Sequence, residues 1–336
     1  MPELTAADEM LIHQLPLALP NVATHHEHWR ESLFFVLHPP DGAADADVLI
    51  LTAATYPARQ VLDSYQMGRV DGSWVFALHE RPHDGDPHTP TIPPMSIEVV
   101  RPYEEVRLRV DEHPSAPYSL DVTFRARTPA HGLRRGTMRW RDELVWDQSH
   151  MIQAGVYDGT YTVAGEERPI DGWWGQRDHS WGIRDHDRCP MWMWFAIQLE
   201  DGMLGVWSWE YANGAPVYLD GCWAPADGGA PTPVVGFDTS GLSWVGADGR
   251  PTGYGRDGTD VRGLAGRVEV TLEGGRVIGV EGEGETSMPY GSRGGGQTLL
   301  RVRTDDGRTG SAIYEITGAH HHRWFPVPRA DRLPPG

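Results

Sequence analysis

The residues best suited to chemistry gather in one segment, positions 171–185, which reads DGWWGQRDHSWGIRD. Charged side chains, a histidine and indoles follow one another there without the apolar alternation of a plain core strand. If the segment is extended, His179 and Trp181 lie on one face, and Asp178 and Ser180 lie on the other. His179 and Ser180 therefore cannot pair as base and nucleophile, and the chain has no GxSxG nucleophile elbow.

An acid–base site is the chemistry that this arrangement permits. His179 is expected to be the general acid or base, because an imidazole moves protons at neutral pH. Asp178 and Arg177 are expected to set its orientation and charge, and the Trp181 indole is expected to stabilise developing positive charge. The alternative is a purely structural ion-pair network at a domain join, formed by Arg177, Asp178, Arg184 and Asp185.

Composition excludes several classes of function. The chain has 336 residues, with 29 basic residues against 47 acidic ones and a net charge of −18, so we expect no nucleic-acid partner. Every basic residue is arginine, which excludes Schiff-base lysines and the phosphate-loop GK[ST] motif. The cysteines, Cys189 and Cys222, form no CxxC pair, so a disulfide scaffold and a cysteine zinc site are excluded.

Apolar runs and histidine clusters point to no membrane span and no metal. No run approaches the roughly 20 apolar residues of a membrane helix, and positions 1–22 lack a secretory pattern, so we expect a cytoplasmic protein. The histidines at 25–28 lack HExxH spacing, and those at 320–322 are contiguous. We therefore expect neither a metal nor another cofactor, and a metal-dependent β-barrel enzyme is the alternative.

Turn signals and strand-like runs predict antiparallel β structure throughout. Asp-Gly and Asn-Gly dipeptides recur beside β-branched and aromatic segments, which is the hairpin pattern. The only predicted helix covers Ala6 to Gln14, with a short turn near Thr24 to Arg30. A polar stretch with a proline, between Arg184 and Pro190, separates two β-rich halves, so we predict domains at 1–186 and 187–336.

A longer pattern resembles a known family. The run from Gly175 to Asp185, preceded by H-x-x-Q-x-G-x-x-x-G at 150–159 and by W-x-E-S-x-F-F at 29–35, resembles the signature of AttH-like proteins related to carotenoid 1,2-hydratase. The resemblance implies an all-β fold of two tandem lipocalin-like barrels with few short helices. It also implies a lipophilic ligand held near their junction and chemistry without a cofactor. The histidine and tryptophan of the hydratase-like members resemble His179 and Trp181.

The chain departs from the hydratase pattern on a later strand. Hydratase-like members are expected to present a tyrosine and an aspartate there, whereas this chain has W-S-W-E-Y at 207–211. Because side chains alternate along a strand, Ser208 and Glu210 share one face, and the three aromatic residues of this run share the other. Glu210 is therefore the candidate for the second acid–base group.

Tryptophans concentrate in the same region and suit an apolar ligand. The alternative is a barrel filled by its own indoles. The predicted substrate-binding residues are Trp174, Trp194, Trp207, Trp209, Tyr65 and Tyr218.

Two functions follow from these observations. The first is a cofactor-independent lyase or isomerase that acts on a lipophilic terpenoid, steroid, polyketide or aromatic compound. The second is a lipocalin-like carrier that binds such a compound without changing it. The sequence does not select the reaction, the substrate or the oligomeric state.

Overall fold

The computed structural model describes residues 4–11, 13, 26–83, 90–188, 191–255, 258, 260–291, 294–318 and 322–325. The chain divides into two compact units. The first unit contains Met1–His38 and Val48–Asp185, and the second contains Pro39–Asp47 and His186–Gly336. The chain thus leaves the first unit after its first strand, contributes residues 39–47 to the second unit, and returns to the first unit at Val48.

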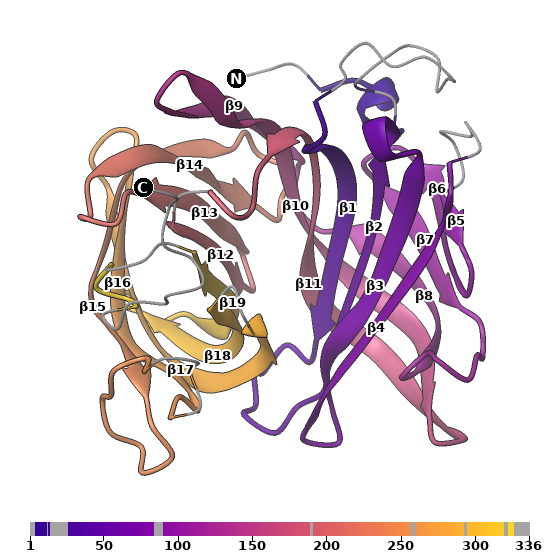
Figure 1. Ribbon diagram of the computed structural model, residues 1–336. Coiled ribbons are helices and arrows are strands. Elements are labelled where there is room, and N and C mark those ends of the chain that lie inside the picture. The colour runs from indigo at the N-terminus through magenta and orange to yellow at the C-terminus, as the bar shows by residue number, and fades with distance from the viewer. Residues whose placement is uncertain are drawn as a thin grey trace. The chain divides into compact units, whose positions relative to one another are not determined.

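The first unit is an antiparallel sheet of eleven strands (Figure 1). The strands are β1 (Trp29–His38), β2 (Val48–Tyr56), β3 (Val61–Val70), β4 (Ser73–Pro82), β5 (Thr91–Ile92), β6 (Met95–Arg101), β7 (Glu105–Val110), β8 (Ser119–Ala126), β9 (His131–Trp140), β10 (Glu143–Val163) and β11 (Glu166–Arg184). They follow the order β4-β3-β2-β1-β11-β10-β8-β7-β6-β5, and β9 pairs with β10 off this path. The end strands β4 and β5 also contact each other, so the sheet is nearly closed.

The second unit is a closed antiparallel barrel of eight strands in sequence order. They are β12 (Met191–Leu199), β13 (Gly202–Glu210), β14 (Pro216–Pro225), β15 (Thr232–Val245), β16 (Gly263–Leu272), β17 (Val277–Pro289), β18 (Gly295–Thr304) and β19 (Thr309–Thr317). Closure removes the unpaired strand edges that would otherwise invite association. The prediction of an all-β fold with two barrel-like sheets is confirmed.

Each unit has its own apolar core. In the first, alternate residues of β1, such as Leu33, Phe35 and Leu37, point inward and pack with residues of β2, β7 and β8. In the second, the core gathers alternate residues of β12, β13, β16 and β19. The period of two along each strand fixes which side chains are inside, and therefore which polar groups lie beside the core.

Helical structure is limited to two short 3-10 turns in the described residues, η1 (Ala6–Glu9) and η2 (Pro57–Arg59). The predicted helix from Ala6 to Gln14 is therefore only four residues long within the described part, and Gln14 lies outside it. At the predicted turn near Thr24 to Arg30, residues before 26 are not described and β1 begins at Trp29. Among the described residues, no helix has the length and apolar character needed to cross a membrane.

Candidate active site

Strand β11 sends alternate side chains to opposite faces of the first sheet. Its pairing with β1 places His179 beside Leu33, which belongs to the apolar core, so His179 faces inward. Asp178 and Ser180 face outward, where the Arg184 guanidinium donates to the Ser180 hydroxyl. The predicted separation of the histidine from the neighbouring serine is confirmed, and no nucleophile–base pair exists at this point.

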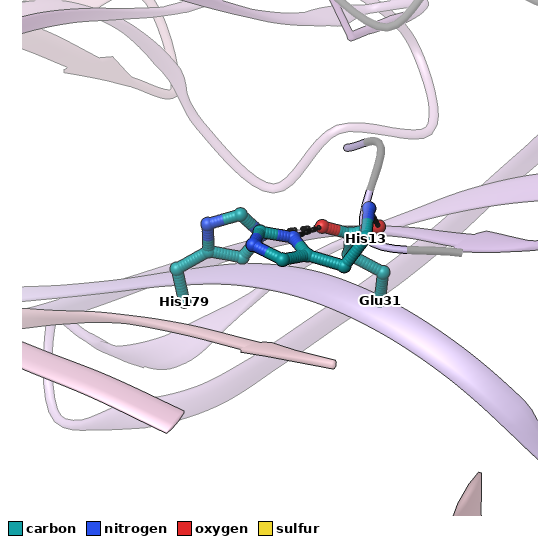
Figure 2. Close-up of side chains that lie close together, drawn as sticks. All are labelled: His13, Glu31 and His179. Atoms are coloured by element: carbon teal, nitrogen blue, oxygen red, sulfur yellow. Dashed lines mark hydrogen bonds and ion pairs between the residues drawn. The ribbon is translucent and has the colours of Figure 1, made fainter. Parts of the chain in front are cut away.

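The inward histidine belongs to a cluster centred on Glu31 of β1. Figure 2 shows two imidazoles converging on this carboxylate. Glu31 Oε1 lies 2.5 Å from His13 Nδ1 and 3.0 Å from His179 Nε2. Glu31 Oε2 accepts a hydrogen bond of 3.1 Å from the His13 backbone N–H. One carboxylate thus ties the N-terminal segment to the strand that carries His179.

Asp8 holds the opposite edge of both rings. Its carboxylate Oδ1 lies 2.8 Å from His13 Nε2, and its backbone carbonyl accepts from His179 Nδ1 at 2.6 Å. The side chains lose exposure along the chain of contacts, from 21% for Asp8 to 13% for His13, 1% for Glu31 and 0% for His179. A continuous path of hydrogen bonds therefore runs from the surface to a fully buried imidazole.

Trp181 forms the partly exposed rim of this cluster. Its indole stacks on the His13 imidazole with ring centroids 3.5 Å apart and an angle of 13°. It also meets the His179 ring edge-on at 5.2 Å. Trp181 and His13 are only partly buried, so these two rings and the Asp8 carboxylate form the partly exposed side of the cluster.

The surroundings shift the pKa values of Glu31 and His13 in opposite directions. Burial alone would raise the pKa of the Glu31 carboxyl, but hydrogen bonds and positive charge from His13 and His179 outweigh burial and hold that pKa below its usual value. Burial alone would lower the pKa of His13, but the carboxylates of Glu31 and Asp8 raise it above its usual value. Glu31 and Asp8 therefore favour the protonated form of the rim imidazole, which lies in contact with both carboxylates.

Arg177, on the same inward face of β11, contacts Glu9 rather than His179. The guanidinium donates to both carboxylate oxygens of Glu9, at 2.7 Å and 2.5 Å, and to Gln153 Oε1. Both members of the ion pair are almost fully buried. This pair anchors η1 against the sheet, next to the Asp8 carbonyl that receives the His179 hydrogen bond.

The other predicted residues of the first unit lie on its outward face. Asp178 Oδ2 is 3.3 Å from His150 Nε2, and Tyr65 occupies the same face on β3. The Trp174 indole lies under the Arg127 guanidinium, 4.3 Å from it. Glu31 and the Asp8 carbonyl, and not Asp178, are the groups that hydrogen-bond His179.

The predicted second acid, Glu210, belongs to the second unit. Its carboxylate Oε2 lies 2.7 Å from Nε2 of His322, which is almost fully buried. The register of β12 against β13 pairs Glu210 with Met191 of the barrel core. His179 and Glu210 are thus each placed within a different compact unit.

The predicted aromatic residues of the second unit cluster with one another. Trp209 stacks on Tyr218 at 4.4 Å, and Trp207 meets Trp209 edge-on at 4.8 Å. Trp194 on β12 pairs in register with Trp207 on β13. The predicted parity, with the indoles on one face of β13 and Ser208 on the other, agrees with this pairing.

Sequence reasoning missed the N-terminal contributors to the inward cluster. Glu31 stood within the quoted W-x-E-S-x-F-F pattern, and a carboxylate in the middle of an apolar strand was the signal that it is buried and paired. His13, Asp8 and Glu9 carried no such signal, because they lie outside the strands and reach the cluster only through the fold.

Comparison with known proteins places the chain in a family. The model of a family described as of unknown function, DUF8625, matches residues 4–248. The chain belongs to DUF8625. No curated protein matches this DUF8625 chain by sequence.

Solved structures share the fold of this DUF8625 member. An AttH-like protein from Nitrosomonas europaea matches with a TM-score of 0.58 at 13% identity, over 87% of this chain and 94% of that one. Kievitone hydratase from Nectria haematococca matches with a TM-score of 0.53 at 13% identity, over 86% of this chain and 89% of that one. CghA matches with a TM-score of 0.56 at 10% identity, over 87% of this chain and 89% of that one. These similarities establish the architecture and agree with the AttH-like resemblance.

Proposed function

We propose that the protein is an acid–base enzyme that acts on a lipophilic small molecule. The reaction is addition or loss of water, movement of a double bond, cleavage of a carbon–carbon bond, or ring closure. The observation that carries the proposal is the buried Glu31 carboxylate, which links an accessible imidazole, His13, to the fully buried imidazole of His179. Such a chain supplies or removes protons without a redox group.

Each member of the cluster has a role in this proposal. The carboxylates of Glu31 and Asp8 favour a proton on His13, and Asp8 is partly exposed, so His13 exchanges protons with water. Glu31 passes protons between the rings, and His179 holds the buried proton. The Trp181 indole stacks beside the donors and stabilises a carbocation or polarised double bond by its π face.

The fold neighbours support the proposed class of reaction. A kievitone hydratase and CghA share this architecture, and a CghA structure contains Sch210972. The motif that resembles carotenoid 1,2-hydratase supports His179 and Trp181 as its working residues. Trp174 and Tyr65 lie on the face of the first sheet opposite His179, so this proposal gives them no contact with the ligand. Glu210 as a second acid, and Trp194, Trp207, Trp209 and Tyr218 as ligand contacts, stay predictions from the sequence.

The test measures whether the protein converts any compound of a panel, in ordinary and in deuterated water. The panel contains kievitone, an acyclic terpenoid polyene, a steroid and an aromatic polyketide, and mass spectrometry detects added water or solvent deuterium. We expect wild type to convert one of them and His179→Gln to be slower by about 10²–10⁴-fold. The His113→Ala variant changes an exposed histidine outside the cluster and should retain full activity.

Ligand binding separates the enzyme from a carrier. Quenching of tryptophan fluorescence measures binding for wild type and His179→Gln, and circular dichroism confirms that both are folded. Binding with lost turnover in the variant supports the proposal. Binding without turnover in either protein identifies a carrier, and full turnover by the variant removes His179 from the mechanism.

A further inference from the structure

Three potential metal ligands in the first unit point toward one another. His13 Nδ1, Glu31 Oε1 and His179 Nε2 all lie within 4.8 Å of one another (Figure 2). Two imidazole nitrogens and one carboxylate oxygen are the ligand set that Zn²⁺ and neighbouring divalent transition metals prefer. Three protein ligands are also the number found in zinc sites that keep a fourth position open.

The hydrogen bonds behind these ligands match those of metal sites. A ligating imidazole usually donates its second N–H to a carbonyl or carboxylate, which fixes the ring and its tautomer. Here Asp8 serves both rings, because its carboxylate faces His13 Nε2 and its carbonyl accepts from His179 Nδ1. The Glu31 carboxylate is itself fixed through Oε2 by the His13 backbone N–H.

With both imidazoles neutral, the hydrogen bonds around Glu31 leave a place for a cation between the three side chains. A neutral imidazole has one N–H. The Asp8 carbonyl accepts that of His179, and in the Nε2–H tautomer the Asp8 carboxylate accepts that of His13. The remaining nitrogen of each ring is then a lone pair that faces Glu31 Oε1, which is also an acceptor. Three acceptors that meet in a buried place need either additional protons or one metal ion between them.

We propose that His13, Glu31 and His179 bind one divalent transition-metal ion of the Zn²⁺ class. Ligand atoms around a tetrahedral ion lie about 3.3 Å apart, and His179 Nε2 already lies 3.0 Å from Glu31 Oε1. His13 Nδ1, at 2.5 Å from the same oxygen, needs to withdraw by about 1 Å. His13 lies outside the described strands, so this shift breaks no strand pairing.

The metal and the proposed proton path use the same atoms, so the proton path is blocked while a metal ion is bound. The inference does not depend on the proposed function, because metal binding is measured without any substrate. If turnover fails on every compound and binding succeeds, only the proposed function is lost. If binding fails and turnover succeeds, only the metal site is lost.

The experiment uses the full chain, freed of metal with a chelator and dialysed. Isothermal titration with ZnSO₄ measures affinity and stoichiometry, and visible absorption with CoCl₂ reports the ligand set. We expect one ion per chain, and His13→Ala should weaken binding by more than about 100-fold. Asp8→Ala leaves all three ligands in place and removes the carboxylate behind His13, so it should weaken binding by about 10–100-fold.

A matched control tests a competing site. His28 is partly buried and lies 3.6 Å from carboxylates of Glu27 and Asp185, so it offers a histidine among acids outside the cluster. His28→Ala should bind Zn²⁺ as wild type does, with circular dichroism confirming the fold of each variant. Absence of binding by wild type, equal binding by His13→Ala, or loss of binding in His28→Ala would each overturn the proposed site.

Discussion

The ion pair between Glu9 and Arg177 is the most deeply buried charge contact of the N-terminal segment. Both side chains are 1% exposed. Replacing Glu9 with glutamine leaves the Arg177 charge buried without its partner, which typically costs about 3–5 kcal/mol. We expect Glu9→Gln to lower the free energy of unfolding by that amount at neutral pH, as measured by urea titration.

An exposed ion pair serves as the control for this prediction. Arg107 and Asp121 lie 2.8 Å apart with both side chains nearly half exposed, so Asp121→Asn should cost only about 0–1 kcal/mol. Equal losses in Glu9→Gln and Asp121→Asn would contradict the argument from burial.

Glu9 also makes the free energy of unfolding depend on pH. Burial raises the pKa of Glu9, but hydrogen bonds and charge from Arg177 outweigh burial and hold the pKa below its usual value of 4.5. A depressed pKa adds stability that is complete above pH 4.5 and is lost as the pH falls through the folded value. The difference in stability between wild type and Glu9→Gln should therefore shrink on acidification below that pH.

Sequence reasoning reached some of these residues and not others, for a physical reason. His179, Trp181 and Arg177 lie in one strand, and a period of two is enough to place them on one face. Asp8, Glu9 and His13 are brought to that face by chain folding, and no local period encodes such a contact. Asp8, the N-terminal partner of His179, was therefore not predictable from the sequence, whereas Glu31 was marked by its place in an apolar strand.

At the scale of the element, β11 must approach β1 closely to present His179. Gly175 permits this approach, because a Cβ at its position would lie 1.8 Å from the Val36 carbonyl oxygen. Gly175→Ala should therefore destabilise the protein by about 1–3 kcal/mol or more through overpacking. The midpoint of urea unfolding measures the effect.

The control substitution uses a glycine in open space. A Cβ at Gly253 would meet no atom within 4 Å, and its backbone is not left-handed. Gly253→Ala should change stability by less than about 1 kcal/mol. A similar loss in both variants would show that close approach at Gly175 is not what requires glycine there.

Elements themselves were largely predictable, because turn dipeptides and alternating runs mark strands locally. β3 ends at Val70 and β4 begins at Ser73, on either side of the Asp71-Gly72 dipeptide, as the hairpin pattern predicts. The helix from Ala6 to Gln14 was overextended: apolar spacing alone favoured it, whereas η1 ends at Glu9. Contacts of Glu9 and His13 with the sheet override the local preference.

At the scale of the whole molecule, residues 39–47 belong with the second unit. Gly42 has a left-handed φ of 60°, and a Cβ there would lie 2.6 Å from the Leu300 carbonyl oxygen. The Arg301 side chain also donates to the Asp41 carbonyl, at 3.1 Å. No pattern in the sequence marks this short segment as part of the later barrel, because its contacts lie about 260 residues away along the chain.

Gly42→Ala tests how strongly this segment is attached. Gly72 has a similar φ of 70°, with no atom within 4 Å of a Cβ. Both substitutions incur a left-handed penalty of about 1–2 kcal/mol, and Gly42→Ala should add about 1–3 kcal/mol from overpacking. The two free energies of unfolding measure the difference, and equal values would mean that the segment is loosely held.

This path of the chain limits how the protein can be recombined with its relatives. The polypeptide changes units after residues 38, 47 and 185. A chimera joined only at residue 185 would combine one parent's barrel with the other parent's 39–47 segment. A compatible exchange transfers that short insert together with the C-terminal half, so a hybrid gene needs three junctions rather than one.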